Sequence, residues 1–274
     1  MRPFPAALLG VCVLTALLEL ATPNPSSAVA GTSALAAPNG CGDMRLFWHR
    51  GDRYSGHTEN SRQALRLAVA KGYGLETDLR TTKDGRIILM HDKTVNRTTS
   101  GHGDVDALTA ATIRKHRLED GSKVPYLAAA LQILENHDGS RGMLELKPHA
   151  MPRSSLRKLW SHIDDKHLRH RVIIYSYDRH ELLRFRRISK GVATSLIPHG
   201  DERDWSADTF LHYGGLTTRS SDVSSGLSRR ARKIGLDVIA WAAAGPARWR
   251  SNVEAGTYGL ILNHPGRYAR WCGE

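Results

Sequence analysis

Cysteines, acidic residues and long apolar runs are all scarce in this chain. Its 274 residues include three cysteines, too few for a small scaffold that depends on several disulfides. One apolar run stands near the N-terminus, and no later segment is long and apolar enough to cross a membrane. The 27 acidic side chains are outnumbered by 39 cationic ones, which gives a net charge of +12. Such an excess attracts anions, among them phosphoesters, anionic lipids, teichoic acids and nucleic acid.

The basic residues form two clusters, but neither cluster resembles a nucleic-acid motif. Both fall within helical patterns, and apart from Phe185 no aromatic residue is interleaved with them. We therefore interpret them as solvated helix faces that bias the long-range field. Nucleic acid is therefore not an expected partner, whereas an anionic membrane or cell-wall surface suits the charge. The clusters comprise Arg184, Arg186, Arg187 and Lys190, and Arg229, Arg230, Arg232 and Lys233.

The apolar run Ala6–Leu18 is typical of a secretory signal. An early cation precedes it, and an Ala-Val-Ala motif that ends at Ala30 supplies small residues for cleavage. The sequence thus predicts a signal peptide over residues 1–30, a flexible mature N-terminus over 31–40 and a single domain over 41–274. The mature protein is expected to be secreted to the extracellular space.

Strand-like runs alternate with helical patterns along most of that domain. The first helix is clearly marked, with Asn60 as its predicted N-cap, Gln63 three residues on and Gly72 as its stop. This alternation predicts a parallel sheet and, at this length, a closed (β/α)8 TIM barrel. The predicted helices cover Ser61–Lys71, Leu127–Asn136, Ser155–Ile163, Arg179–Ile188 and Ser225–Ile234. The predicted strands cover Arg45–His49, Leu75–Leu79, Ile87–His91, Gly142–Leu146, Val172–Ser176, Ala193–Ile197, Gly215–Thr218, Val238–Trp241 and Leu260–Leu262.

One of these strands is surplus to a barrel of eight. Only Arg80–Arg86 separates the second run from the third, which is too short for a crossover between parallel strands. Asp84-Gly85 is a typical two-residue hairpin turn. The third run should therefore return antiparallel, as a hairpin flap (about residues 75–92) at the C-terminal mouth of the barrel. With a two-residue turn, Asp78 and His91 would face each other directly.

Two cysteines, Cys41 and Cys272, stand at the two ends of the domain. Exported proteins meet oxidising conditions, so a Cys41–Cys272 disulfide is the expected state. The bond requires Cα atoms within about 7 Å of each other, and a closed barrel satisfies this because its first and last strands are neighbours. Two independent buried thiols are the alternative.

Carboxylates occupy predicted inward positions at two strand ends. Alternation directs Glu76 and Asp78 into the barrel, and Glu145 and Lys147 repeat the pattern on a later strand. Buried acids are costly unless a cation neutralises them. Three carboxylates without a nearby thiol suit one divalent cation, Ca²⁺ or Mg²⁺, better than Zn²⁺. A structural network of ion pairs is the alternative.

Histidines end two of the apolar runs. His49 closes the first strand and His91 closes the flap, which makes them candidates for a proton-transfer pair. Arg50 and Lys147 would supply positive charge for a phosphate, the guanidinium through two hydrogen bonds and the ammonium as a point charge. Gly51 would let the backbone come close to a ligand.

Together these residues resemble the glycerophosphodiester phosphodiesterases. The ordered match extends over Phe47–Lys147 and implies a barrel of the phosphatidylinositol-phospholipase-C-like type. The matching segments are His49-Arg50-Gly51, Glu59-Asn60-Ser61, Glu76-Thr77-Asp78, Thr82-Lys83-Asp84-Gly85, His91-Asp92 with Arg97-Thr98-Thr99, and Leu144-Glu145-Leu146-Lys147.

The resemblance also implies roles for individual residues. One divalent cation would be held by Glu76, Asp78 and Glu145. The acid–base pair would be His49 and His91, and the phosphate would be bound by Arg50 and Lys147.

The likeness to this family is weaker in the C-terminal half. Trp241 stands where the family has Trp-Thr-Val-Asn, but three alanines follow it here. Trp241 is a candidate wall of the substrate pocket, with plain core packing as the alternative. Leu262-Asn263-His264-Pro265 stands where the family usually has Thr-Asp-x-Pro. The side of the site that binds the alcohol therefore departs from the family pattern.

The resemblance implies a phosphoric diester hydrolase with a single catalytic domain. It would hydrolyse small or lipid-derived glycerophosphodiesters to glycerol 3-phosphate and an alcohol, with a metal ion and the histidine pair. Two enzymatic alternatives are a phospholipase-D-like enzyme that acts on lysophospholipids or sphingolipids and a teichoic-acid glycerophosphodiesterase. A basic anion-binding barrel without activity is the non-enzymatic alternative.

Overall fold

The structure, a computed structural model, describes residues 41–198 and 212–273. The predicted signal peptide (1–30) and mature N-terminus (31–40) lie outside this part of the chain. Within it, every helix is too short or too polar to span a bilayer.

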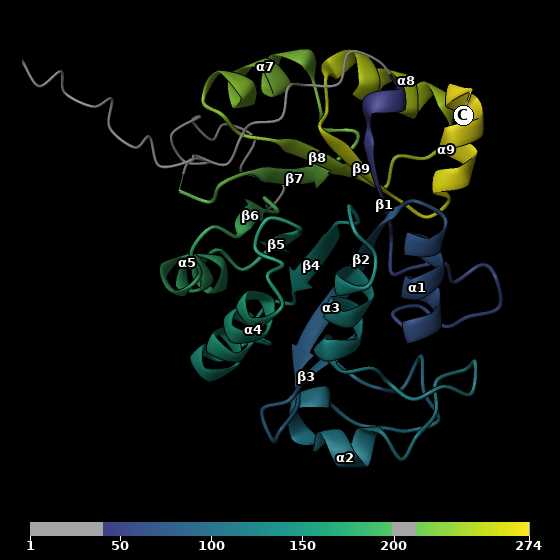
Figure 1. The fold of residues 1–274 in the computed structure, drawn as a ribbon, viewed down its shortest axis with the longest axis vertical. Coiled ribbons are helices and arrows are strands. Elements are labelled where there is room, and N and C mark those ends of the chain that lie inside the picture. The colour runs from purple at the N-terminus through teal and green to yellow at the C-terminus, as the bar shows by residue number, and fades with distance from the viewer. Residues whose placement is uncertain (1–40, 199–211, 274) are drawn as a thin grey trace, which may run out of the picture. The chain divides into compact units, whose positions relative to one another are not determined.

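The strands form the closed barrel predicted from the sequence (Figure 1). Eight of them are parallel and follow one another as β1-β2-β4-β5-β6-β7-β8-β9. The ring closes because β1 pairs with both β2 and β9. The strands are β1 (Arg45–Trp48), β2 (Gly74–Thr81), β3 (Ile87–Leu89), β4 (Gly142–Leu146), β5 (Val172–Ser176), β6 (Ala193–Leu196), β7 (Leu216–Arg219), β8 (Val238–Trp241) and β9 (Gly259–Leu262).

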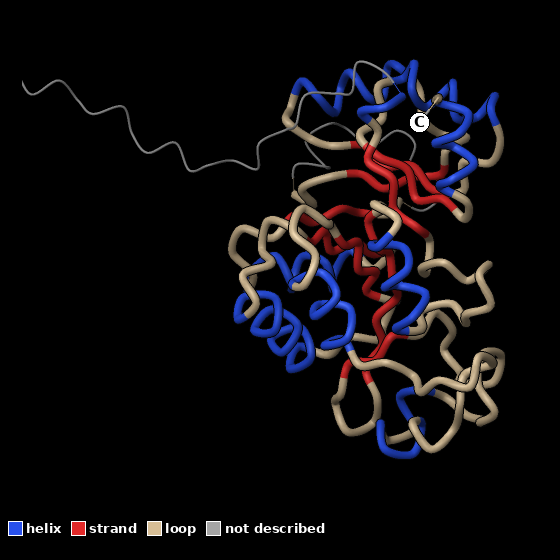
Figure 2. Tube along the Cα trace, turned by 45° about the vertical axis from the view of Figure 1, so that its right-hand side comes forward, coloured by secondary structure: helices blue, strands red, loops and turns tan. Residues whose placement is uncertain are grey.

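Helices flank these strands on the outside of the ring (Figure 2). Among the described residues, the short helices η1, η2 and α2 and the longer helices α8 and α9 had not been predicted. The two longer ones were missed because each begins at a proline, and Gly-Pro or Pro-Gly reads as a turn. Proline is nevertheless well suited to the first turn of a helix. The helices are η1 (Cys41–Asp43), α1 (Arg62–Ala70), η2 (Val105–Ala107), α2 (Ala110–Ile113), α3 (Leu127–Glu135), α4 (Arg153–Asp165), α5 (Arg179–Ile188), α7 (Ser225–Lys233), α8 (Pro246–Ala255) and α9 (Pro265–Cys272).

The hairpin of β2 and β3 is antiparallel as predicted, but its register is shifted by one residue. Met90 lies opposite Asp78, and its N–H donates to the Asp78 carbonyl at 3.0 Å. The prediction that His91 faces Asp78 directly was therefore wrong. The turn explains the shift, because the Gly85 N–H donates to the Thr82 carbonyl at 2.8 Å and Gly85 has a φ of 71°. A three-residue loop with a left-handed glycine replaces the predicted two-residue turn.

Alternation along the strands separates an inner core from an outer one. The outer side chains of β2, β4, β5 and β6 pack under α1, α3, α4 and α5, and those of β7, β8 and β9 pack under α7, α8 and α9. Polar inward side chains are concentrated where the strands end, and apolar ones fill the barrel interior below them. The inner core contains Phe47, Met143, Ile173, Tyr175, Ile197, Ile239, Tyr258 and Ile261.

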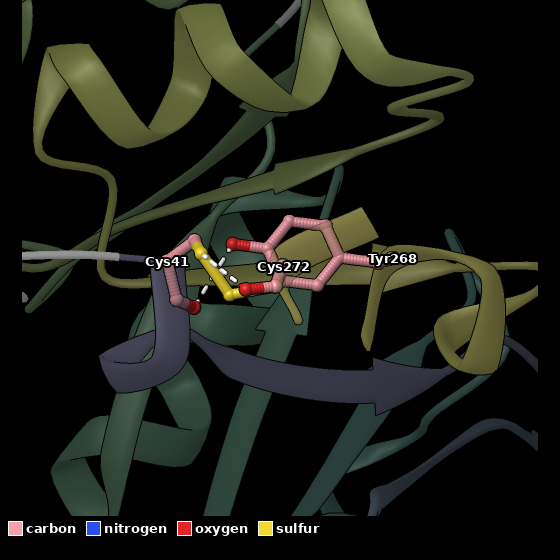
Figure 3. The surroundings of a disulfide bond; sticks show 3 residues. All are labelled: Cys41, Tyr268 and Cys272. Carbon is pink, nitrogen blue, oxygen red and sulfur yellow. Dashed lines mark hydrogen bonds between the residues drawn. A yellow bond between two sulfur atoms is a disulfide. The ribbon is translucent and has the colours of Figure 1, made fainter. Parts of the chain in front are cut away.

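The predicted disulfide between Cys41 and Cys272 is present (Figure 3). Its Cα atoms lie 5.8 Å apart and its partners are 231 residues apart in the sequence. The Tyr268 hydroxyl donates to the Cys41 carbonyl at 3.1 Å and joins α9 to η1 a second time. Because Cys41 directly precedes β1, the bond lies at the end of the barrel where the strands begin.

Candidate active site

Three carboxylates converge at the C-terminal mouth of the barrel. Glu76 and Asp78 project inward from β2, and Glu145 projects from β4 as the register partner of Asp78. One oxygen from each carboxylate lies within 4.8 Å of the others, and all three side chains are buried. We call these residues the acidic triad. Alternation on two adjacent strands is enough to assemble it.

Burial and mutual repulsion perturb this triad strongly. Burial raises the pKa of Glu76 to about 7, and the charge of Asp78 acts in the same direction. The pKa of Glu145 is raised to about 7 for the same two reasons. Burial would also raise the pKa of Asp78, but the charges of Lys147 and Arg50 outweigh it and the pKa is lowered.

The two cations of the site lie against the acidic triad. Lys147 Nζ is 2.8 Å from Asp78 Oδ1 and 2.8 Å from Glu145 Oε1. Arg50 Nε is 3.4 Å from Asp78 Oδ2, and the Arg50 backbone N–H donates to Glu76 Oε2 at 2.7 Å. Two cations against three carboxylates leave a negative charge in excess, which a bound metal ion would neutralise.

The donor set of the acidic triad fits a hard divalent cation. All of its ligand atoms are carboxylate oxygens, the type that Mg²⁺ and Ca²⁺ prefer. Asp78 Oδ1 is buried and accepts no well-aligned hydrogen bond from the described residues, although the Lys147 ammonium is close. Among the described residues, this is the one group of three side chains with metal-binding geometry.

His49 follows β1 at the mouth and is held by the end of β9. The backbone N–H of His49 donates to the Leu262 carbonyl at 3.0 Å, and its ring Nδ1 lies 2.8 Å from Asn263 Oδ1. Arg53 Nη2 approaches the same Oδ1 at 3.5 Å. Since an amide oxygen only accepts, Nδ1 carries the proton and Nε2 is left as the acceptor. Burial lowers the pKa of His49, and the charge of Arg50 lowers it further.

His91 follows the flap and has a carboxylate partner instead. Its Nδ1 lies 2.7 Å from Asp92 Oδ1, and the other Asp92 oxygen accepts from Arg97 Nε at 2.6 Å. The hydrogen bond from Arg97 is the main reason that the pKa of Asp92 is lowered. Burial lowers the pKa of His91, and the Asp78 carboxylate acts against that shift. His91 therefore lies near the acidic triad even though it is not the register partner of Asp78.

Asn60 has a role at the site that was not predicted. The helix α1 is capped by Ser61, whose Oγ accepts from the Ala64 N–H at 3.2 Å, and not by Asn60. The Asn60 amide donates to Asp78 Oδ2 at 2.8 Å and accepts from the Thr77 hydroxyl at 2.6 Å. Asn60 is buried and has a φ of 59°. It fixes the orientation of a predicted metal ligand.

Two further residues, to which the sequence analysis assigned no role, support the site. Tyr175, from β5, donates to Glu76 Oε1 at 2.7 Å across the barrel interior. Glu59 accepts from Arg50 at 3.0 Å, Arg53 at 3.2 Å and Arg97 at 2.6 Å. The signal for Glu59 was the segment Glu59-Asn60-Ser61, which contains more polar residues than capping a helix requires.

The backbone of Arg50 and Gly51 makes a tight turn after β1. Arg50 has a φ of 57° and Gly51 a φ of 76°. A Cβ atom on Gly51 would lie 2.5 Å from the Ala64 carbonyl carbon of α1. Gly51 therefore allows a close approach to α1, and the close approach of a ligand to this backbone stays a prediction. This turn aims the Arg50 N–H at Glu76.

Trp241 lies at the other side of the mouth from the acidic triad. It ends β8, and β8 is opposite β4 in the ring of eight parallel strands. The Arg219 guanidinium carbon lies 5.4 Å from the centre of the Trp241 ring, and the two residues are register partners. The structure thus brings together the acidic triad, Arg50 and Lys147, and it places Trp241 across the mouth from them.

The fold and the site define a class of protein, which is a TIM barrel whose mouth can hold a metal ion beside two imidazoles. The chain belongs to the glycerophosphoryl diester phosphodiesterase family, whose model matches residues 49–267. The match begins at His49 and includes every polar residue of the site described above.

Two glycerophosphodiester phosphodiesterases are similar in sequence to this chain over different shares of their own length. The chain is 34% identical to bovine (Bos taurus) glycerophosphodiester phosphodiesterase 1 over 169 residues, which cover 58% of this chain and 49% of that protein. It therefore spans about half the length of this relative. It is 25% identical to a glycerophosphodiester phosphodiesterase of Caldanaerobacter subterraneus over 227 residues, 79% of this chain and 93% of the relative.

Solved structures share the fold. A glycerophosphodiester phosphodiesterase from Parabacteroides distasonis superimposes with a TM-score of 0.74 at 20% identity, covering 84% of this chain and 97% of that one. A phosphodiesterase from Oleispira antarctica, solved with its product sn-glycerol-3-phosphate, gives a TM-score of 0.71 at 18% identity, with 84% and 97% covered.

Proposed function

We propose that this protein hydrolyses glycerophosphodiesters to glycerol 3-phosphate and an alcohol in a metal-dependent reaction. The observation that carries the proposal is the buried acidic triad with its excess negative charge, next to two cations and two imidazoles. Family membership and the names of the relatives support the substrate class. The proposed product is also the one bound to the Oleispira antarctica phosphodiesterase.

In the proposed reaction, the acidic triad would hold Ca²⁺ or Mg²⁺, which would draw charge from the phosphate oxygens. Arg50 and Lys147 bind the phosphodiester and neutralise its remaining charge. Of the two histidines, one accepts the proton of the attacking hydroxyl, and the other protonates the leaving alkoxide, which is too basic to depart alone. Trp241 borders the substrate on the opposite side of the mouth.

The same proposal includes export to the extracellular space. Residues 1–30 would be removed as a signal peptide, 31–40 would form a flexible N-terminus, and 41–274 would be the catalytic domain. The disulfide between Cys41 and Cys272 supports this, since such bonds persist in oxidising compartments. The net charge of +12 would favour contact with an anionic membrane or cell wall.

The decisive experiment is release of glycerol 3-phosphate from glycerophosphocholine, measured with a chelator and after Ca²⁺ and Mg²⁺ are added back separately. We expect the chelator to abolish hydrolysis and one of the two ions to restore it. Full activity in the chelator would contradict the role of the acidic triad. If the protein cleaves neither this diester nor a generic aryl phosphodiester with any ion, the barrel is a binding protein and the proposal fails.

Histidine variants test the proton transfers in the same assay. His49→Ala and His91→Ala should each lower kcat by a factor of about 10² to 10⁴ without unfolding the barrel. His162→Ala, at an exposed position of α4, is the matched control and should retain full activity. Near-normal hydrolysis by either site variant would contradict the acid–base pair. Lysophospholipid, sphingomyelin and teichoic acid complete the substrate panel and would reveal the two alternative activities.

A further inference from the structure

Arg219 lies at the mouth of the barrel but has no part in the proposed chemistry. Thr217, two residues earlier on β7, faces the interior, where its hydroxyl lies 2.7 Å from that of Ser195. Alternation along β7 therefore directs Arg219 to the same inner face. Arg219 is the last residue of its strand, at the end of the barrel where the strands carry the acidic triad.

Arg219 is stacked on the indole ring of Trp241. The guanidinium carbon lies 5.4 Å from the ring centre, which is a cation–π contact. The Arg219 side chain is exposed. Among the described residues, no carboxylate forms an ion pair with it. Its positive charge is therefore available to a ligand at the mouth.

Tyr177 is influenced by charges from both sides of the mouth. Burial raises the pKa of Tyr177 and Glu145 raises it further, while Lys147 and Arg219 both lower it. Tyr177 also packs with Trp241 against the inner core. The Tyr177 hydroxyl therefore lies within electrostatic range of both the proposed phosphate-binding Lys147 and the Arg219 guanidinium.

The pair offers hydrogen-bond donors and positive charge. The Trp241 indole N–H is buried and has no acceptor in the part of the chain that the structure describes. A quaternary ammonium group, as in choline, would normally be attracted to an indole face. Here a guanidinium already lies over that face, so a second cation would be repelled.

On the basis of the proposed function, we propose that Arg219 and Trp241 select diesters whose alcohol carries a negative charge. With the diester phosphate at Lys147 and Arg50, the alcohol extends across the mouth to the Arg219 guanidinium. A second phosphate, as in the next unit of a glycerol phosphate chain, would form charge-assisted hydrogen bonds there. Choline would meet like charge, which is specificity by repulsion.

The test compares three soluble substrates, which are glycerophosphocholine, glycerophosphoglycerol and glycerophosphoglycerol with a terminal phosphate. We expect kcat/KM for the phosphorylated substrate to exceed that for the choline substrate by about tenfold. Arg219→Gln should lower kcat/KM for the phosphorylated substrate by about tenfold. It should change kcat/KM for glycerophosphoglycerol by no more than about twofold. Arg219→Glu should reverse the order of the two charged substrates.

Arg230→Gln is the matched control, because it removes the same charge from an exposed position on the outer helix α7. It should leave the ratio of the substrates unchanged. If the phosphorylated substrate is not preferred, or if Arg219→Gln lowers kcat/KM for all three equally, the inference is wrong while the proposed function stands. If the unaltered protein cleaves none of the three, the proposed function fails and the inference fails with it.

Discussion

At the scale of single residues, the imidazole of His49 is held by a neutral amide, whereas that of His91 is held by a carboxylate. Asn263→Asp would place a negative charge beside His49 Nδ1 and stabilise the imidazolium. The limb of the pH profile that His49 controls should then move to higher pH by about one unit. The measurement is kcat/KM against pH for the variant and the unaltered protein.

The charges around His49 decide how far that limb can move. Burial, Arg50 and Arg53 lower the pKa of His49, whereas the hydrogen bond with Asn263 and the charge of Asp78 raise it. Asn263→Ala is the control, because it removes the hydrogen bond without adding charge. It should lower kcat without moving the limb to higher pH. A pH profile of Asn263→Asp that coincides with that of the unaltered protein would show that Asn263 does not position His49.

Residue by residue, the acids and cations of the site could be predicted because alternation on a buried strand determines which side chains face inward. Their supports could not be predicted. Asn60 reads as a helix cap, and only the folded backbone turns its amide toward Asp78. Asn263 and Tyr175 contact residues 214 and 99 positions away. Such contacts depend on barrel closure, and no local pattern indicates them.

At the scale of elements, all nine strands of the described part of the chain could be predicted from short apolar runs, but the register of one hairpin could not. The hydrogen bond of Gly85 to Thr82 adds one residue to the loop and moves every pair in β2 and β3. The helices α8 and α9 were missed because proline and glycine at their starts indicate turns as well as first helical residues.

Helix α5 makes a testable contribution to stability through one buried acid. Glu181 accepts from the Met151 N–H at 3.0 Å and so holds the loop between β4 and α4. Its other oxygen is buried without a partner among the described residues. Burial raises the pKa of Glu181 to about 7 from an ordinary value of 4.5. The folded state therefore binds a proton that the unfolded chain has lost between these values, and stability from this group falls as pH rises through that window.

Glu181→Gln should remove this pH dependence. Relative to the unaltered protein, the free energy of unfolding of the variant should rise by about 3 kcal/mol between pH 4.5 and pH 7.5. Urea unfolding of both proteins at several pH values measures the difference between their free energies of unfolding. The other titrating groups cancel in this difference, because both proteins contain them. Glu254→Gln, at an exposed position of α8, should show no such trend. A constant difference between Glu181→Gln and the unaltered protein would mean that Glu181 does not titrate in this window.

At the scale of the whole molecule, the disulfide closes a loop of 231 residues at the end of the barrel away from the mouth. Replacing Cys41 and Cys272 by serine should lower the free energy of unfolding by about 5 kcal/mol, because the unfolded chain regains the entropy of that loop. The barrel should still close, since β1 and β9 pair over four residues. We therefore expect a lower Tm with kcat/KM unchanged at 25 °C.

Thermal unfolding of the oxidised protein, the reduced protein and the double serine variant checks this expectation. Reduction and substitution should lower the Tm to the same value, because both remove only the covalent link. The acidic triad and Lys147 are positioned by β2 and β4, which pair over five residues. Loss of hydrolysis on reduction, in a protein that remains folded, would mean that the two chain ends control the geometry of the mouth. The expectation that the disulfide contributes to stability and not to activity would then be wrong.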